Sequence, residues 1–169
     1  MNYADFRHLA ETGDLLLLEG RGLFSTPIRM ITGQQASHVA ILLWIADGLW
    51  VAEMRGQGYT LMRASQRVSE MGEHGQVYWG KAPYRLRWQV NEVRDAALSY
   101  RGYRYSWWTL ITVWLSQVTR RRMPSNLVCS TLVQRVWSAA GFQFTQTPDP
   151  GDFFKLCAAV TPLHTDATE

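Results

Sequence analysis

Residues 37–43 read Ser-His-Val-Ala-Ile-Leu-Leu, and residues 126–133, much later in the chain, read Asn-Leu-Val-Cys-Ser-Thr-Leu-Val. The first stretch predicts a buried strand that opens on His38, and the second predicts the start of a helix that carries Cys129. A histidine and a cysteine brought together in a fold supply the base and the nucleophile of thiol catalysis. The order of the two, histidine before cysteine, is the feature from which the rest of the interpretation follows.

Length and composition are those of a folded domain with a substantial core. The chain has 169 residues, of which 47% are hydrophobic and 18% are charged. We therefore expect a single domain over 1–164 with a frayed tail over 165–169. The formal net charge of +3 is compatible with an anionic partner but too small to identify one.

The two cysteines, Cys129 and Cys157, are interpreted as reduced thiols, because no secretion signal precedes them. No apolar run approaches the roughly 20 residues needed to cross a bilayer. We therefore expect a cytoplasmic protein that does not span a membrane. No cofactor is indicated, and the histidines and cysteines lack the spacing of metal ligands.

The pattern of apolar residues and breakers predicts an α+β chain with a strand-rich first half and a helical second half. The expected strands are 15–18, 38–45, 49–54 and 76–79, with the 38–45 and 49–54 pair forming a hairpin. The expected helices are 3–10, 87–100, 106–119 and 125–140, followed by a last ordered piece over 153–160.

Cys129 falls in the first turn of the predicted 125–140 helix. Unpaired backbone N–H groups and the helix dipole favour a thiolate over a thiol at that position. The alternative is a small core residue, since free cysteine is among the most buried residue types. Cys157 lies within an apolar segment with no helix cap beside it, and we expect it to serve packing.

A thiolate–imidazole pair usually needs a third polar group that orients the ring and sets its tautomer. Glu53 lies on the return strand of the predicted hairpin. A four-residue loop over 45–48 pairs Glu53 with Ala40 and leaves it diagonal to His38, at roughly 7 Å between Cβ atoms, within reach of a glutamate. A two-residue loop would instead turn Gln57 toward the histidine. We predict the wider loop, with a solvated Glu53 as the alternative.

Five segments, in their order along the chain, carry a resemblance to a known family. They are Gly13-Asp14-Leu15-Leu16-Leu17, Ser37-His38-Val39-Ala40-Ile41, Trp50-Val51-Ala52-Glu53, Cys129-Ser130-Thr131-Leu132-Val133 and Thr147-Pro148-Asp149-Pro150-Gly151-Asp152. Together they resemble the circularly permuted, papain-like branch of the NlpC superfamily, the YaeF/YiiX-type amidases. Ordinary members of that superfamily place the cysteine helix before the histidine strand, and this branch is similar to them with the order reversed.

The resemblance implies a papain-like α+β fold in which the cysteine helix packs on an antiparallel sheet. It implies Cys129 as nucleophile, His38 as general base and then acid, and Glu53 as the orienting residue of an amidase. The resemblance also suggests that the substrates are cell-wall peptides. Just before the histidine, Gln34, Gln35 and Ser37 are expected to line the substrate cleft.

Residues 103–115 are rich in tyrosine and tryptophan and are followed by three arginines at 120–122. Such a helix can lie at a lipid interface, but a core-facing helix with a basic end is the ordinary explanation. No nucleic-acid-binding motif accompanies these residues, so we do not expect a nucleic-acid partner.

Three classes of function remain open from the sequence. They are a thiol hydrolase of amide bonds, a lipid-directed acyl hydrolase or acyltransferase on the same fold, and a binding module that lacks catalysis. The sequence leaves the oligomeric state open.

Overall fold

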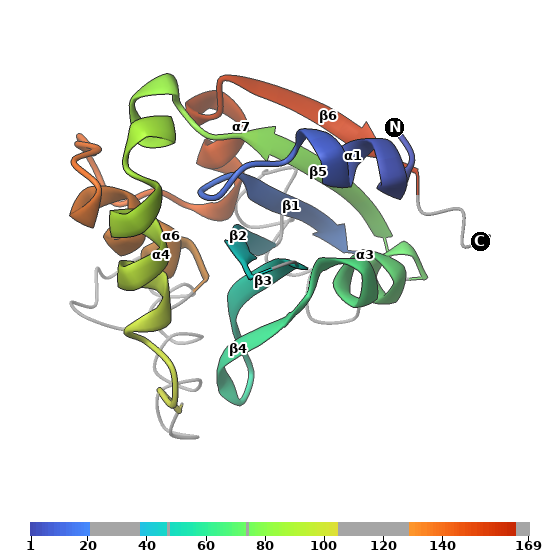
Figure 1. Ribbon diagram of the computed structural model, residues 1–169, viewed down its shortest axis with the longest axis horizontal. Coiled ribbons are helices and arrows are strands. Elements are labelled where there is room, and N and C mark those ends of the chain that lie inside the picture. The colour runs from blue at the N-terminus through green and yellow to red at the C-terminus, as the bar shows by residue number, and fades with distance from the viewer. Residues whose placement is uncertain (21–37, 47, 74, 105–128, 165–169) are drawn as a thin grey trace, which may run out of the picture.

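A six-stranded antiparallel sheet forms the centre of the computed structural model, which describes residues 1–20, 38–46, 48–73, 75–104 and 129–164 (Figure 1). Its strands lie in the order β4-β3-β2-β1-β5-β6. Their bounds are β1 Leu15–Gly20, β2 His38–Ile45, β3 Gly48–Arg55, β4 Gly58–Arg63, β5 Gly75–Lys81 and β6 Ala159–Leu163. The fold class is therefore α+β, as the sequence predicts.

Five α-helices in the described residues surround the sheet: α1 Tyr3–Leu9, α3 Ala64–Gly72, α4 Val90–Leu98, α6 Cys129–Ala139 and α7 Phe153–Leu156. Two 3-10 helices, η1 Tyr84–Trp88 and η2 Pro150–Asp152, precede α4 and α7. Helices α4 and α6 pack on one face of the sheet, and α1 and α3 pack on the other (Figure 1). Among these described helices, none has the length and apolar character required to cross a bilayer.

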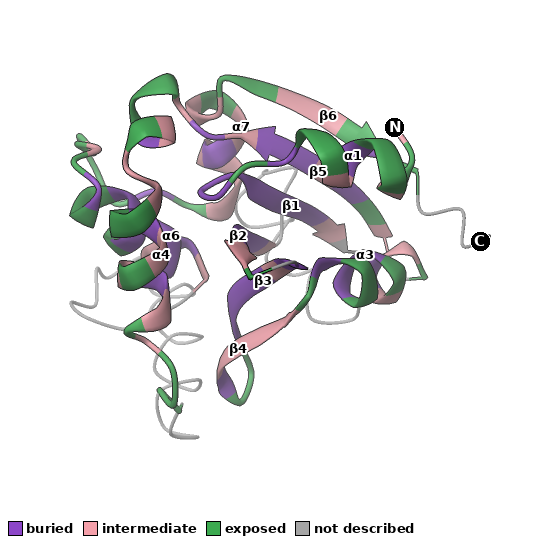
Figure 2. Cartoon of the chain, in the orientation of Figure 1, coloured by how far each residue is buried: buried purple, intermediate pink, exposed green. Residues whose placement is uncertain are grey.

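The central strands are buried on both faces, which explains their nearly continuous apolar sequence. All four leucines of 15–18 are inaccessible to solvent. Leu15 and Leu17 face α4 and α6, whereas Leu16 and Leu18 face α1 and α3. The exposed and half-buried segments lie on the helices and at the sheet edges (Figure 2). Burial of this apolar surface is the main stabilising contribution to the fold.

The Gly13-Asp14 turn, which precedes β1, forms hydrogen bonds with β5, with the residue after β5 and with α6. Gly13 has a φ of 99°, and its carbonyl oxygen accepts a hydrogen bond of 3.1 Å from Nε1 of Trp137 on α6. The buried carboxylate of Asp14 accepts hydrogen bonds of 2.8 Å from both Trp79 Nε1 and the Ala82 backbone N–H. The turn therefore joins the start of β1 to the end of β5 and fixes α6 against the sheet.

Most of the predicted elements are present. Strand β2 has the predicted bounds, and α1 and β5 match to within one or two residues. The predicted helix at 87–100 is shorter, because the chain first makes η1 and α4 begins only at Val90. Trp88, the last residue of η1, is 74% exposed. The predicted helix at 106–119 and the start of the 125–140 helix lie outside the described residues.

Three elements were missed, and one of them is a strand in the half of the chain that was expected to be helical. Strand β6, from the C-terminal region, pairs with β5 at the sheet edge. Strand β4 is an edge strand that is mostly half-buried, so its residues show little alternation of apolar and polar types. Helix α3 has only four buried residues in nine, one of them an arginine.

The β2–β3 hairpin has the register predicted for Glu53. The strands pair from Ile41 with Ala52 to Ile45 with Gly48, and continuing this register by one residue pairs Glu53 with Ala40. The loop is narrower than predicted, because Ile45 and Gly48 still pair as strand residues and only positions 46 and 47 connect them. Ala46 takes a positive φ of 51°, which is unfavourable for a residue with a Cβ atom.

Replacing Ala46 with glycine should therefore stabilise the hairpin. We expect Ala46→Gly to raise the free energy of unfolding by about 1 kcal/mol, measured by urea denaturation. The matched control is Gly141→Ala, since Gly141 has a φ of 86° and a Cβ placed there would meet no atom within 4 Å. That variant should lose about 1 kcal/mol. Equal stability of Ala46→Gly and wild type would show that the turn is not strained.

Candidate active site

His38 opens β2 at the point where that strand emerges from the core. It lies opposite Leu18 of β1, and its side chain is 20% exposed. Because every second residue of a strand points to the same face, the side chain of His38 lies on the face of Ala40 and Leu42, which pack against α1 and α3. The backbone therefore holds the imidazole at a fixed place on the rim of the sheet.

Glu53 of β3 lies on the same face of the sheet and contacts the histidine directly. His38 Nε2 and Glu53 Oε2 are 2.7 Å apart in a hydrogen bond. The predicted proximity of the two residues is thus confirmed. The alternative residue, Gln57, lies in the exposed turn between β3 and β4, and a solvated Glu53 is excluded because its side chain is fully buried.

Two arginines neutralise the buried carboxylate. Arg67 of α3 places Nε 2.9 Å from Glu53 Oε1, and Nε of Arg55 lies 3.9 Å from the same oxygen. Burial alone would raise the pKa of Glu53, but the hydrogen bond and charge of His38, together with the charges of Arg67 and Arg55, lower it below its usual value. Glu53 is therefore ionised at neutral pH.

Cys129 is the first described residue of α6 and packs on the side of the sheet that α4 and α6 cover. Burial alone would raise the pKa of its thiol. The positive charge and hydrogen bond of His38, and hydrogen bonds from the backbone N–H groups of Val39 and Ser130, instead lower that pKa. Position at the start of a helix acts in the same direction. The thiol is thus favoured as a thiolate.

The histidine joins the thiol to the carboxylate. Burial lowers the pKa of His38, but the charge and hydrogen bond of Cys129 and the hydrogen bond and charge of Glu53 raise it to about 9. Because Nε2 is bonded to Glu53, Nδ1 is the ring nitrogen that remains for the sulfur. The arrangement favours a thiolate–imidazolium ion pair at neutral pH.

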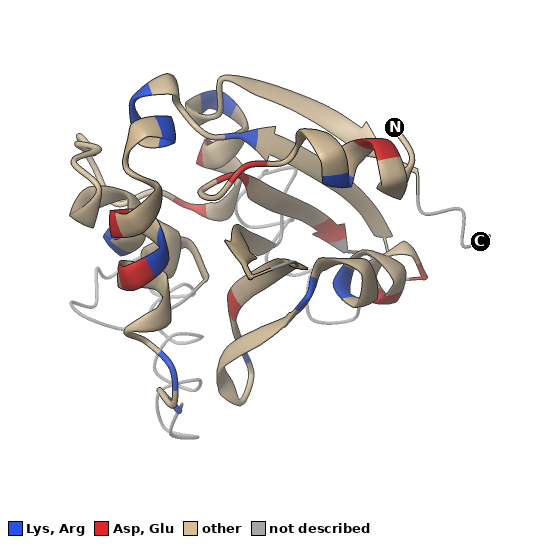
Figure 3. Cartoon of the chain, viewed as in Figure 1, with Lys and Arg blue, Asp and Glu red and all other residues tan. Residues whose placement is uncertain are grey.

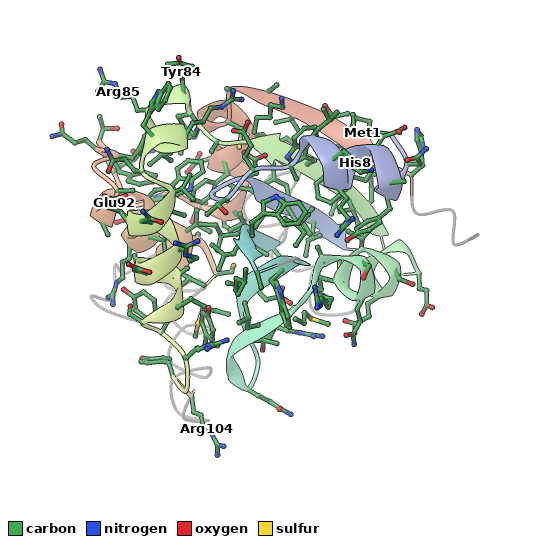
Figure 4. All side chains as sticks on the ribbon, viewed as in Figure 1. Met1, His8, Tyr84, Arg85, Glu92 and Arg104 are labelled. Atoms are coloured by element: carbon green, nitrogen blue, oxygen red, sulfur yellow. The ribbon has the colours of Figure 1, made fainter. Side chains whose placement is uncertain are left out.

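Two other histidines and the second cysteine differ from this pair in their surroundings. His8 on α1 (Figure 4) and His164 after β6 are exposed. Burial and the nearby charge of Asp14 raise the pKa of Cys157 to about 12. Its sulfur instead fills space against Gly80, where a Cβ atom would lie only 2.6 Å away. Cys157 is therefore a packing residue, as the sequence predicts.

The predicted cleft residues Gln34, Gln35 and Ser37 lie outside the described residues, as does most of the aromatic segment at 103–115. The sequence interpretation did not find Arg67, because α3 itself was not predicted. One signal was present: Arg67 lies between Ala64, Val68 and Met71, which share its buried side of the helix. An arginine flanked by buried apolar residues at helical spacing indicates a buried cation that needs a carboxylate.

The fold is similar to that of a solved bacterial protein. The crystal structure of the metalloprotein yiiX from Escherichia coli O157:H7, a DUF1105 protein, superposes with a TM-score of 0.59 at 19% sequence identity. The match covers 77% of this chain and 66% of that protein, so the chain spans about two thirds of its length. No protein-family model matches the sequence, and neither does any curated protein.

The donors described here do not fit a metal centre. Within the described residues no three or more His, Cys, Asp or Glu side chains are grouped as metal ligands. His38 Nε2 and Glu53 Oε2 are bonded to each other at 2.7 Å, closer than two ligands that share one ion. The likeness to yiiX therefore extends to the YaeF/YiiX-type fold and not to a metal centre in the residues that the structure describes.

Proposed function

We propose that the protein is a cysteine hydrolase that cleaves amide bonds through Cys129, His38 and Glu53. The observation that carries the proposal is the continuous contact from a thiol with a lowered pKa, through an imidazole, to a fully buried carboxylate 2.7 Å from that ring. Nucleophile, base and orienting group are arranged in this way in thiol hydrolases.

In the first half of the reaction, the Cys129 thiolate attacks the carbonyl carbon of the amide. The tetrahedral oxyanion is stabilised by backbone N–H groups, that of Cys129 at the start of α6 among them. His38 then transfers its proton to the amine nitrogen as the carbon–nitrogen bond breaks. The amine leaves, and a thioester between the substrate acyl group and Cys129 remains.

In the second half, His38 is neutral and acts as a base. It takes a proton from water, the hydroxide adds to the thioester carbonyl, and the carbon–sulfur bond breaks to release the carboxylic acid. The thiolate and the imidazolium are thereby restored. Glu53 keeps the ring oriented through both halves, and its negative charge stabilises the imidazolium.

The order of the histidine strand and the cysteine helix along the chain supports a more specific proposal for the fold. Here the histidine strand β2 precedes the cysteine helix α6, and α6 packs on β2 and β3. That arrangement supports a papain-like domain of the NlpC type in permuted order. We propose peptides as the substrate class, with cell-wall peptides as the first source to test.

Selective labelling of the two cysteines tests the nucleophile. At pH 7, iodoacetamide should modify Cys129 at least tenfold faster than Cys157, because the pKa of the first is lowered and that of the second is raised to about 12. Mass spectrometry of tryptic peptides over time gives both rates. Cys157→Ala should keep the fast phase and Cys129→Ala should lose it. Equal rates in wild type would contradict the proposal.

Titration of His38 tests the ion pair. In nuclear magnetic resonance spectra the ring of wild-type His38 should lose its proton near pH 9. Both Cys129→Ala and Glu53→Gln should lower the His38 midpoint, because each removes a negative partner of the imidazolium. A wild-type midpoint near the ordinary histidine value would rule out the pair.

Hydrolysis assays test the bond that is cleaved. Peptidoglycan fragments, synthetic peptides and lipid esters should be compared at equal concentration, and we expect product only from the peptide-containing substrates. Cys129→Ser should lower the rate by a factor of at least 1,000, on the scale of other lost catalytic nucleophiles. Turnover of lipid esters alone would assign the site to acyl-lipid chemistry instead.

A further inference from the structure

The two oxygens of the Glu53 carboxylate have different partners. Oε2 accepts the hydrogen bond of His38, whereas Oε1 lies 2.9 Å from Nε of Arg67. The Glu53 side chain is fully buried and that of Arg67 is only 8% exposed. A buried arginine requires a partner of opposite charge, because removing a charge from water is unfavourable unless the charge is paired.

A chain of alternating charges continues from Arg67 to the surface. Its Nη1 lies 3.4 Å from Oε2 of Glu70, one turn along α3, and the same oxygen lies 3.6 Å from Nη1 of Arg55. Glu70 and Arg55 are 37% and 41% exposed. Figure 3 shows that α3 and β3 each carry both acidic and basic segments. Arg67 is thus the buried link between the proposed active site and this outer pair.

We propose that Arg67 is a positioning residue of the active site, which orients the Glu53 carboxylate and keeps it ionised so that Glu53 can hold His38 as an imidazolium. The inference rests on the proposed function. Arg67 acts through Glu53 and touches neither the thiol nor the substrate.

The geometry gives Arg67 both parts of this role. Contact at Oε1 leaves Oε2 directed to the histidine, so the carboxylate cannot rotate without losing one of its partners. The positive charge also offsets the burial of Glu53, which would otherwise favour the neutral acid. Arg55 is a weaker substitute, because it lies 3.9 Å from Oε1 and is partly exposed to water.

The ionisable groups that face this chain from the packed elements are His38 on β2, Arg55 on β3, Glu70 on α3 and Cys129 on α6. Loss of Arg67 raises the pKa of Glu53, so that the neutral acid form becomes more favourable. A neutral Glu53 stabilises the imidazolium less, so the pKa of His38 falls. Since His38 then offers less positive charge to the sulfur, the pKa of Cys129 rises.

The test is the pH dependence of Cys129 alkylation in Arg67→Met, from pH 4 to pH 10. We expect the rise of the alkylation rate with pH, the acid limb of the profile, to shift to higher pH by about one unit. At a given pH on that limb the rate then falls about tenfold, while the limiting rate at high pH stays the same. A purely structural loss would change the limiting rate or abolish folding, and would leave the limb in place. Arg67→Lys, which keeps the charge, should recover most of the shift.

The control for loss of an arginine is Arg87→Met. Arg87 forms a more exposed ion pair, with Nε 3.2 Å from Glu11 Oε2, in η1. Its alkylation profile should equal that of wild type. In a Glu53→Gln background, Arg67→Met should produce no further shift, because the carboxylate through which it acts is absent.

Each outcome has one interpretation. If Arg67→Met fails to fold by circular dichroism, Arg67→Gln replaces it, since its side chain is polar but carries no charge, and the same shift is expected. A folded Arg67→Met or Arg67→Gln with the wild-type acid limb overturns the inference and leaves the proposed function standing. A wild type in which Cys129 is alkylated no faster than Cys157 overturns the proposed function itself.

Discussion

The buried carboxylate of Glu53 is the constraint on which the arrangement of the site depends. A glutamate with no exposure to solvent is stable as an anion only if cations reach it from within the protein. Here they come from two separate elements, His38 at the start of β2 and Arg67 on α3. The negative charge of Glu53 is therefore stabilised only when β2 and β3 keep this register and α3 keeps its packing. A shift of the hairpin by one residue would turn Glu53 to the opposite face of the sheet.

The cysteine is positioned by a different set of contacts. Helix α6 packs on β2 and β3 through Leu132, Val133 and Val136, and Trp137 near its end donates to the Gly13 carbonyl oxygen. The Gly13-Asp14 turn is in turn held by Trp79 and the backbone of Ala82. Sheet and helix thus supply histidine and thiol independently, and the buried turn sets their relative position. Gly13 and Asp14 therefore have a structural role, and their hydrogen bonds involve none of the three proposed catalytic residues.

The parts of the site that the sequence predicts are those that depend on strong local patterns. Strand β2 is a long apolar run that opens on a histidine, so its bounds follow from the sequence alone, and the register of the hairpin follows once Glu53 is required to face His38. Arg67 could not be predicted in the same way, because α3 has few apolar residues and its arginine resembles a solvated one. The helix predicted at 87–100 begins too early for a different reason: Trp88 belongs to η1, and Gln89 separates η1 from α4.

The two cysteines show why residue type and burial alone do not identify a nucleophile. Neither is bridged, both are partly buried, and burial acts to raise the pKa of each. Cys157 has only the negative charge of Asp14 near it, which raises its pKa further. Cys129 has an imidazole held positive by a buried carboxylate, and backbone N–H groups directed at its sulfur. The opposite shifts of the two thiols therefore originate in the sign of the nearest charge. The thiolate itself and, two contacts from the sulfur, the carboxylate of Glu53 together keep that imidazole positively charged.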